Sequence, residues 1–192
     1  MAHRPEERRL HHVGAPERLD HLVGNLLDLS RLQAGAAQPD RGLVEVEELV
    51  LEAIDELGAA AARVDVTFAD EPHAVVVDAH QIRRVLVNLL ENALKYSPAG
   101  EPVRVHVSAG PSEALVRVID HGPGVLPAER ERIFEPFHRG ARGGDAPGAG
   151  LGLAIARGFA EANGGRLAVE SRLGQGATFV LALPTVRAPV AA

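Results

Sequence analysis

Two asparagines and the only lysine of the chain lie close together in the segment N-L-L-E-N-A-L-K-Y, as Asn88, Asn92 and Lys95. In a helix that turns by about 100° per residue, these three side chains share one stripe beside the apolar stripe. Asparagine is unfavourable inside a helix because its amide competes with the backbone for hydrogen bonds, so two of them four residues apart need an explanation. Carboxamide oxygens can ligate a hard cation, and a lysine ammonium can bind phosphate as a point charge. The alternative is that both amides are simply solvated.

A second candidate is the segment D-H-G-P-G, which begins at Asp120 where a predicted strand ends. An aspartate held at the end of a strand can accept a hydrogen bond from the amino group of a base. Gly122 and Gly124 would let the backbone approach a flat ligand closely, because glycine has no Cβ. The alternative is a strand that is followed by an ordinary turn.

A third candidate is a run of alternating glycines, Gly148, Gly150 and Gly152, directly before a predicted helix. Glycines at this position expose backbone N–H groups at the positive end of the helix dipole, an arrangement that suits polyphosphate. The G-x-G-x-G spacing is not the dinucleotide fingerprint, and it is not a Walker loop, because the only lysine lies elsewhere. The alternative is a flexible hinge.

The elements that must position these residues follow from hydrophobic periodicity and turn signals. Helices are predicted at 16–34, 45–62, 78–96, 127–137 and 151–162, and strands at 64–68, 74–77, 102–109, 114–120, 166–171 and 177–183. Asp78 is expected to cap the third helix, and Ser97-Pro98 to end it. Helices mixed with mostly antiparallel strands, without regular βαβ alternation, predict an α+β two-layer sandwich over 45–184. Around it we expect a disordered segment at 1–15, a separate helix at 16–35, a linker at 36–44 and a flexible tail at 185–192.

The first predicted helix carries an apolar stripe that something must cover. Leu19, Leu22, Leu26 and Leu29 are spaced by three, four and three residues, the spacing of a coiled-coil seam. Such a stripe can pack on the domain that follows, or it can pair in a helical bundle or dimer. The sequence leaves both possibilities open.

The composition excludes several classes of function. The chain has 192 residues, of which 46% are hydrophobic and 24% charged, as in soluble globular proteins. The absence of cysteine excludes disulfides, thiolate nucleophiles and Cys-ligated metals. A net charge of −6 argues against a nucleic-acid binder held mainly by phosphate contacts. No signal peptide and no apolar stretch long enough for a membrane helix are found, so the sequence predicts a soluble, cytoplasmic chain.

In this order, the motifs resemble the ATP-binding catalytic domain of bacterial sensor histidine kinases, most of all the potassium-responsive ones. The resemblance covers about 16–184 and includes the Asn-x-x-x-Asn helix, D-x-G-x-G, F-E-P-F, the glycine-rich loop and G-Q-G-A-T. It implies the Bergerat fold shared with gyrase, the heat-shock 90 chaperones and the mismatch-repair ATPases. It also implies that the helix at 16–35 is the second helix of a truncated dimerisation hairpin.

The same resemblance implies a role for individual residues. Asn92 would ligate Mg²⁺, Lys95 would contact phosphate, and Asp120 would bind the amino group of adenine. Residues 138–147 would form the lid over ATP. The nucleotide-binding positions implied in this way are Asn88, Asn92, Lys95, Tyr96, Asp120, Gly122, Gly124, Phe134, Phe137, Gly148, Gly150, Gly152, Leu153 and Thr178.

Asn88 distinguishes between reactions within this superfamily. Members that hydrolyse ATP, and the related anti-sigma serine kinases, resemble this chain but carry glutamate where Asn88 stands. A carboxylate can act as a general base for water or a hydroxyl, and an amide cannot. Since an imidazole nucleophile needs less activation, Asn88 favours phosphorylation of histidine, with Asn88 and Lys95 as catalytic residues.

The phosphoacceptor box of the family is missing. The segment from His11 to Pro16 keeps a histidine and a proline at the right spacing, but it lacks the acidic residue, the arginine and the threonine. We therefore expect a kinase fragment that binds ATP and Mg²⁺ and transfers the γ-phosphoryl group to a histidine outside this chain. Its expected partners are a histidine-bearing dimerisation domain and a response regulator, with a possible homodimer through 16–35. The alternatives are a nucleotide-binding module without kinase activity and an anti-sigma-type serine/threonine kinase.

Overall fold

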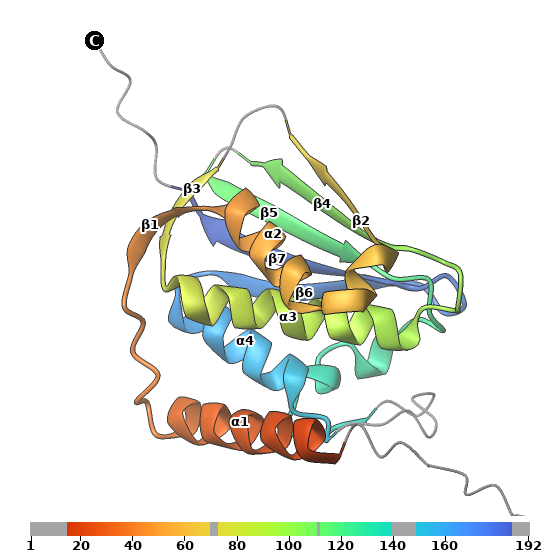
Figure 1. Ribbon diagram of the computed structural model, residues 1–192, viewed down its shortest axis with the longest axis horizontal. Coiled ribbons are helices and arrows are strands. Elements are labelled where there is room, and N and C mark those ends of the chain that lie inside the picture. Colours follow the sequence, from red (N-terminus) through yellow and green to blue (C-terminus); the bar gives the residue numbers. More distant parts are fainter. Residues whose placement is uncertain (1–14, 70–72, 111, 140–148, 186–192) are drawn as a thin grey trace, which may run out of the picture.

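The fold is a sheet with helices packed on one of its faces (Figure 1). The computed structural model describes residues 15–69, 73–110, 112–139 and 149–185. In the order in which they pair, the strands of the five-stranded sheet are β2 (Val64–Phe68), β4 (Val103–Ala109), β5 (Glu113–Ile119), β7 (Ala177–Pro184) and β6 (Arg166–Ser171). The helices in front of it are α2 (Val46–Glu56), α3 (Ala79–Tyr96) and α4 (Gly152–Ala162). The predicted α+β two-layer sandwich is confirmed.

The hydrophobic core lies between these two layers. In β5, burial alternates along the strand, so that Ala114, Val116 and Val118 are fully buried and the residues between them are half-buried. This period of two places one row of side chains against the helices, where Leu86 and Leu89 of α3 are also buried. Strands β2 and β4 are parallel, and the other pairs of this sheet are antiparallel.

The central helix α3 begins and ends as predicted. The Oδ1 atom of Asp78 accepts a hydrogen bond from the backbone N–H of Gln81 at 3.0 Å, and Oδ2 accepts one from the N–H of Asp40 at 3.0 Å. Ser97, directly before Pro98, is extended and closes the helix. Both ends are therefore specified by local side-chain chemistry.

Two predicted elements are corrected by the structure. The helix predicted at 45–62 ends at Glu56, because Gly58 has φ of +57° and the chain continues as the 3-10 turn η1 (Gly58–Arg63). The predicted linker at 36–44 overlaps strand β1 (Gly42–Glu45), which pairs antiparallel with β3 (Ala74–Val77) in a separate two-stranded sheet. The pairing partner of β1 is distant in the sequence, so no local signal reports it.

The short helix predicted at 127–137 is also wrong. The structure has two 3-10 turns there, η2 (Pro127–Glu129) and η3 (Arg132–Phe134). Glu135 is extended, as expected for a residue that precedes proline. The chain therefore cannot continue as one α-helix to Phe137.

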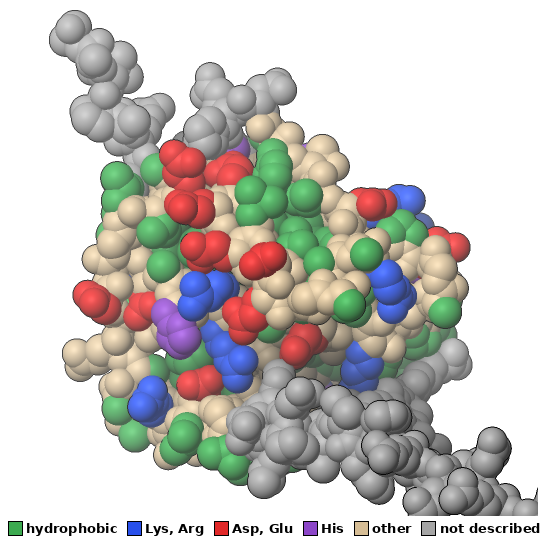
Figure 2. All heavy atoms as spheres, in the orientation of Figure 1, with side chains coloured by type: hydrophobic (Ala, Val, Ile, Leu, Met, Phe, Trp, Pro, Cys, Tyr) green, Lys and Arg blue, Asp and Glu red, His purple; other side chains and the backbone are tan. Residues whose placement is uncertain are grey.

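Helix α1 (Ala15–Gln33) lies beside α4, outside the two-layer sandwich (Figure 1). Leu29 is buried, and Leu32 lies directly over Gly158 of α4, where a Cβ would come within 2.8 Å of its side chain. Packing of this helix on the following domain is thus confirmed for one of its faces. Four other apolar side chains of α1 are exposed, namely Leu22, Val23, Leu26 and Leu27. Figure 2 shows apolar side chains on the surface of α1.

Among the described residues, none of the helices combines the length and the apolar character needed to cross a bilayer.

The cap of α3 gives a first prediction. Asp78→Ala should lower the free energy of unfolding by about 1 kcal/mol, because the N–H groups of Gln81 and Asp40 lose their acceptor. Urea denaturation followed by circular dichroism measures this change. The control is Asp55→Ala on the exposed surface of α2, which should change stability by less than about 0.5 kcal/mol. Equal effects of the two substitutions would contradict the assigned cap.

Candidate functional site

The candidate site is assembled around α3, from the end of β5 and the start of α4. At the C-terminal end of α3, Gly122 lies against Tyr96, where a Cβ would come within 2.9 Å of the tyrosine carbonyl. Two turns earlier on α3, Gly152 lies against Asn88. Three segments that are far apart in the sequence therefore meet along one helix.

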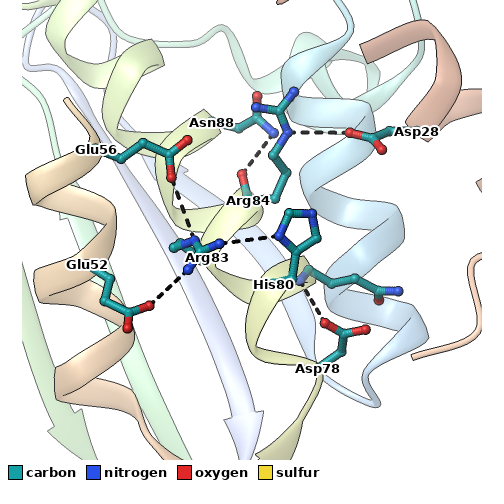
Figure 3. Close-up of polar contacts among 9 residues, drawn as sticks. Asp28, Glu52, Glu56, Asp78, His80, Arg83, Arg84 and Asn88 are labelled. Atoms are coloured by element: carbon teal, nitrogen blue, oxygen red, sulfur yellow. Dashed lines mark hydrogen bonds and ion pairs between the residues drawn. The ribbon is translucent and has the colours of Figure 1, made fainter. Parts of the chain in front are cut away.

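Asn88 is buried rather than solvated, with 5% of its surface exposed. Its Nδ2 donates a hydrogen bond to the backbone carbonyl of Arg84 at 3.0 Å, as Figure 3 shows. Its Oδ1 faces the first residue of α4, Gly152, where a Cβ would lie only 2.9 Å away. The amide thus has one fixed orientation, which the absence of a side chain at Gly152 permits.

The other two residues of this stripe are more accessible. Asn92 is half-buried one turn after Asn88, and Lys95 is exposed in the last turn of α3. The ammonium of Lys95 lies 5.0 Å from the centre of the Tyr96 ring, within the range of a cation–π contact. An amide oxygen and an ammonium group therefore stand near the helix surface, where they can reach a ligand.

Asp120 is buried at the end of β5, with 4% of its surface exposed. Its Oδ1 accepts hydrogen bonds from the backbone N–H groups of Gly122 at 2.8 Å and Ala177 at 3.1 Å. Burial raises the pKa of the Asp120 carboxyl above its ordinary value of 3.8, although these hydrogen bonds oppose the rise. Both of these hydrogen bonds use Oδ1, and the second carboxylate oxygen takes part in neither of them.

Gly176 is required for this arrangement. It has φ of +79°, and a Cβ at this position would collide with the carbonyl of Asp120. The close approach lets the N–H of Asp120 bond to the carbonyl of Ala177 at 2.9 Å. The G-Q-G-A-T motif is therefore the part of the chain that holds Asp120 in place.

Gly122 and Gly124, which we expect to let the backbone approach a flat ligand, also have a role within the protein. A Cβ at Gly122 would meet the backbone of Tyr96, and a Cβ at Gly124 would collide with the carbonyl of Arg172. In the structure, both glycines allow segments of the protein itself to pack closely.

Thr178 lies on a different face of β7 from Ala177, the residue that binds Asp120. Along β7, Ala177 and Phe179 are buried towards the helices, whereas Thr178 is half-buried and paired in register with Ile119 and Glu170. Alternation along a strand therefore assigns Thr178 to the opposite face of the sheet. Its neighbour Ala177, whose N–H binds Asp120, is the residue that the prediction missed.

A shallow hollow of about 430 Å³ lies where β6 turns into β7. Thr178 and Asp120 are among the residues that line it, together with Glu170 and Arg172. No residue of α3 lines this hollow, so it is separate from the stripe that carries Asn88.

The two phenylalanines of F-E-P-F differ in their surroundings. Phe134 is buried, with the guanidinium of Arg157 placed 5.2 Å from the centre of its ring. Phe137 is 63% exposed and has φ of +63°, and its N–H donates to the carbonyl of Gly150 at 2.9 Å. Phe134 is thus a packing residue, and the backbone of Phe137 anchors the glycine-rich segment.

The glycine-rich segment is only partly described. A Cβ at Gly150, which has φ of +72°, would come within 2.8 Å of the carbonyl of His138. Leu153 is half-buried in the first turn of α4. Gly148 and residues 140–147 of the predicted lid lie outside the described residues. What the structure shows is that the N-terminus of α4 begins directly beside Asn88.

Comparison with known proteins shows to which family this chain belongs. Residues 77–187 match the model described as Histidine kinase-, DNA gyrase B-, and HSP90-like ATPase. The chain belongs to this family. The domain that defines the family binds ATP, and the elements described above carry its motifs in the expected order. The resemblance inferred from the sequence is therefore confirmed.

Several relatives of this ATPase family are sensor kinases. Sensor protein KdpD of Rathayibacter rathayi is 40% identical over 173 residues, which cover 90% of this chain and 20% of that protein. Sensor-like histidine kinase SenX3 of Mycobacterium tuberculosis (strain ATCC 25618 / H37Rv) is 38% identical over 174 residues, covering 88% of this chain and 42% of the relative. This chain thus spans about a fifth of the KdpD relative's length and under half of SenX3.

Solved structures show the same fold. Full-length ShkA in complex with AMPPNP has a TM-score of 0.76 and 32% identity, covering 90% of this chain and 37% of that one. The mycobacterial sensor histidine kinase MprB has a TM-score of 0.66 and 29% identity, covering 76% of this chain and 97% of that chain. The fold of this ATPase domain has therefore been observed in experimental structures of similar proteins.

The geometry around Asp120 gives a second prediction. Gly176→Ala should lower the free energy of unfolding by more than about 3 kcal/mol, because the new Cβ is strained and also collides with the carbonyl of Asp120. Gly174→Ala is the matched control, since Gly174 has φ of +78° but nothing within 4 Å of its Cβ position. It should cost only the strain of the left-handed backbone, about 1–2 kcal/mol. Urea titrations of both variants measure the difference, and equal losses would show that the contact with Asp120 is unimportant.

Proposed function

We propose that this chain is the ATP-binding catalytic part of a two-component sensor histidine kinase. It would transfer the γ-phosphoryl group of ATP to a histidine of a dimerisation domain. The observation that carries this proposal is the buried amide of Asn88 beside the N-terminus of α4. The resemblance to the superfamily implies a glutamate at this position in the members that hydrolyse ATP. An amide cannot remove a proton from water, whereas an imidazole attacks with its own lone pair. The sensor kinases among the relatives support the same reaction.

Each part of the site would hold one part of the nucleotide. The second oxygen of Asp120 would accept a hydrogen bond from the amino group of adenine, while Oδ1 stays bonded to Gly122 and Ala177. The phosphates would lie at the N-terminus of α4, where backbone N–H groups and the helix dipole favour anions. Lys95 would add a positive charge from the exposed end of α3.

A magnesium ion would fit this arrangement. Mg²⁺ keeps several waters and is usually held by substrate phosphates together with one or two protein oxygens. The amide oxygen of Asn92, half-buried one turn after Asn88, can supply such a ligand. When bound, the ion would neutralise charge on the phosphates.

The transfer itself needs little covalent help from the protein. The bond between the γ-phosphorus and the β–γ bridging oxygen breaks as a phosphorus–nitrogen bond to the imidazole forms. ADP leaves with the bridging oxygen, and the imidazole releases its N–H proton to solvent. The residues of this chain would therefore act by holding the reactants in line and by stabilising charge.

The partners follow from the proposed reaction. The dimerisation domain would supply the histidine, and a response regulator would then receive the phosphoryl group. The exposed apolar face of α1, formed by Leu22, Val23, Leu26 and Leu27, would pair with other helices of a homodimer. Exposure of these four side chains among the described residues supports such a contact.

Asp120 gives a prediction on pH. Because burial raises its pKa, the carboxylate is protonated at a higher pH than an ordinary aspartate. A protonated carboxyl accepts from adenine poorly, so affinity for ADP should fall as pH is lowered, beginning above the ordinary pKa of 3.8. Calorimetric titration with ADP measures this, while circular dichroism confirms that the protein stays folded.

The control for this prediction is Asp120→Asn. Its amide oxygen would keep the bonds to Gly122 and Ala177, so its NH₂ group would face the amino group of adenine, donor against donor. We expect a loss of affinity of about 10–100-fold at neutral pH and no further loss on acidification beyond the titration of the phosphates and of adenine N1, which both proteins share. Unchanged affinity of Asp120→Asn would contradict the assigned adenine contact.

Phosphoryl transfer is tested with radiolabelled ATP and a separately produced dimerisation hairpin that carries the acceptor histidine. Label on the hairpin that is lost in acid and stable in base supports a histidine kinase, and Asn88→Ala should abolish it. Nucleotide binding without transfer would indicate a binding module. Acid-stable phosphoserine or phosphothreonine on a partner would indicate a serine/threonine kinase. Either of the last two outcomes overturns the proposal.

A further inference from the structure

Arg84 joins α1 to the ATP-binding domain. Its Nη2 donates to the amide oxygen of Asn25 at 3.0 Å, and its Nε pairs with Oδ2 of Asp28 at 3.4 Å. Figure 3 shows Asp28 reaching from α1 towards Arg84 on α3. Asn25 is buried, and the side chains of Asp28 and Arg84 are each only 20% exposed. This is a polar contact that is largely shielded from water, between two helices that are distant in the sequence.

Apolar contacts between described side chains also hold α1, but apolar contacts alone do not define one position. Leu29 is buried, and Leu32 lies on Gly158 of α4. Apolar packing is not directional, and leucines recur along α1 every three or four residues. A helix of this kind could shift along α4 and still bury leucine side chains. Displacing Arg84 would instead leave the buried amide of Asn25 without its donor, which is costly.

Arg84 is also bonded to the site through its backbone. Its carbonyl accepts the hydrogen bond from Nδ2 of Asn88, one helical turn later. The side chain of one residue therefore holds α1, while its main chain orients the amide of Asn88. A movement of α1 would therefore act on the turn of α3 that fixes the orientation of the Asn88 amide.

The preceding residue makes a useful contrast. Arg83 points to α2, where it pairs with Glu52 at 3.2 Å and with Glu56 at 3.6 Å (Figure 3). All three side chains are partly exposed, as expected for surface ion pairs that contribute little. Two consecutive arginines thus connect α3 to two different helices, and only the second is linked to both α1 and Asn88.

We propose that Arg84 is a positioning residue: it fixes α1 in one register on the ATP-binding domain and couples that register to the binding of nucleotide beside Asn88. If the proposed function is right, α1 belongs to the dimerisation hairpin, and this coupling links movement of the hairpin to the catalytic site. The coupling between α1 and nucleotide binding can be tested without measuring phosphoryl transfer.

Docking of α1 can be measured with one engineered disulfide. The chain has no cysteine, so Leu32→Cys with Gly158→Cys introduces a single pair at the contact between α1 and α4. The equilibrium of this pair with glutathione reports the effective concentration of the two thiols. In this background Arg84→Gln should lower the effective concentration about tenfold, because two hydrogen bonds from a charged group are lost. The matched control Arg83→Gln should change it less than about twofold.

Two further measurements complete the experiment: one substitutes Asp28, which pairs with Arg84, and the other adds nucleotide. Asp28→Asn should also lower the effective concentration, and combining it with Arg84→Gln should add little. Mg–ATP should change the effective concentration at least about twofold with Arg84 present, since coupling between two equilibria is reciprocal, and should leave it unchanged in Arg84→Gln. Calorimetry confirms that Arg84→Gln still binds ATP.

Three results would overturn the proposal: an unchanged effective concentration in Arg84→Gln, an equal fall in Arg83→Gln, or no effect of Mg–ATP with Arg84 present. Failure to label an acceptor hairpin would refute the kinase reaction and leave these measurements unaffected. The two inferences are therefore tested separately.

Discussion

The site depends on a buried carboxylate that is held between two strands. Removing the charge of Asp120 from water costs several kcal/mol, and the N–H groups of Gly122 and Ala177 offset part of this cost. These donors are in place because β5 and β7 pair in register and because Gly176 lets the chain pass directly over the carbonyl of Asp120. The geometry of the sheet therefore decides which oxygen of Asp120 is occupied and which is available.

Different faces of helix α3 contact different parts of the molecule. One face is buried against the sheet, Arg83 and Arg84 connect it to α2 and α1, and the stripe from Asn88 to Lys95 faces the site. Its position is set at both ends, by the cap at Asp78 and by the stop before Pro98. A rotation of α3 would disturb every one of these contacts. The packing that holds α3 in the core therefore also fixes the position of the site residues on this helix.

Local patterns in the sequence predict much of this architecture. The Asp78 cap, the hairpin of β4 and β5 and the order of the motifs all depend on neighbouring residues, and the structure confirms them. Strand β1 was not predicted, because its partner β3 is about thirty residues away and both strands are short. The motif pointed to Thr178 and not to its neighbour Ala177, whose N–H binds Asp120, and one residue decides which face of a strand a side chain occupies. The packing roles of Gly122 and Gly124 depend on distant backbone, which no motif reports.

The contact between Asn88 and Gly152 also restricts how this site can evolve. The amide already fills the space that a Cβ on Gly152 would need, so the two positions cannot both become larger. A glutamate at position 88 would carry one more methylene group into a pocket where 5% of the present side chain is exposed. Converting this site into one that hydrolyses ATP would therefore require α4 to move as well. The side chain of Asn88 and the start of α4 have to change together.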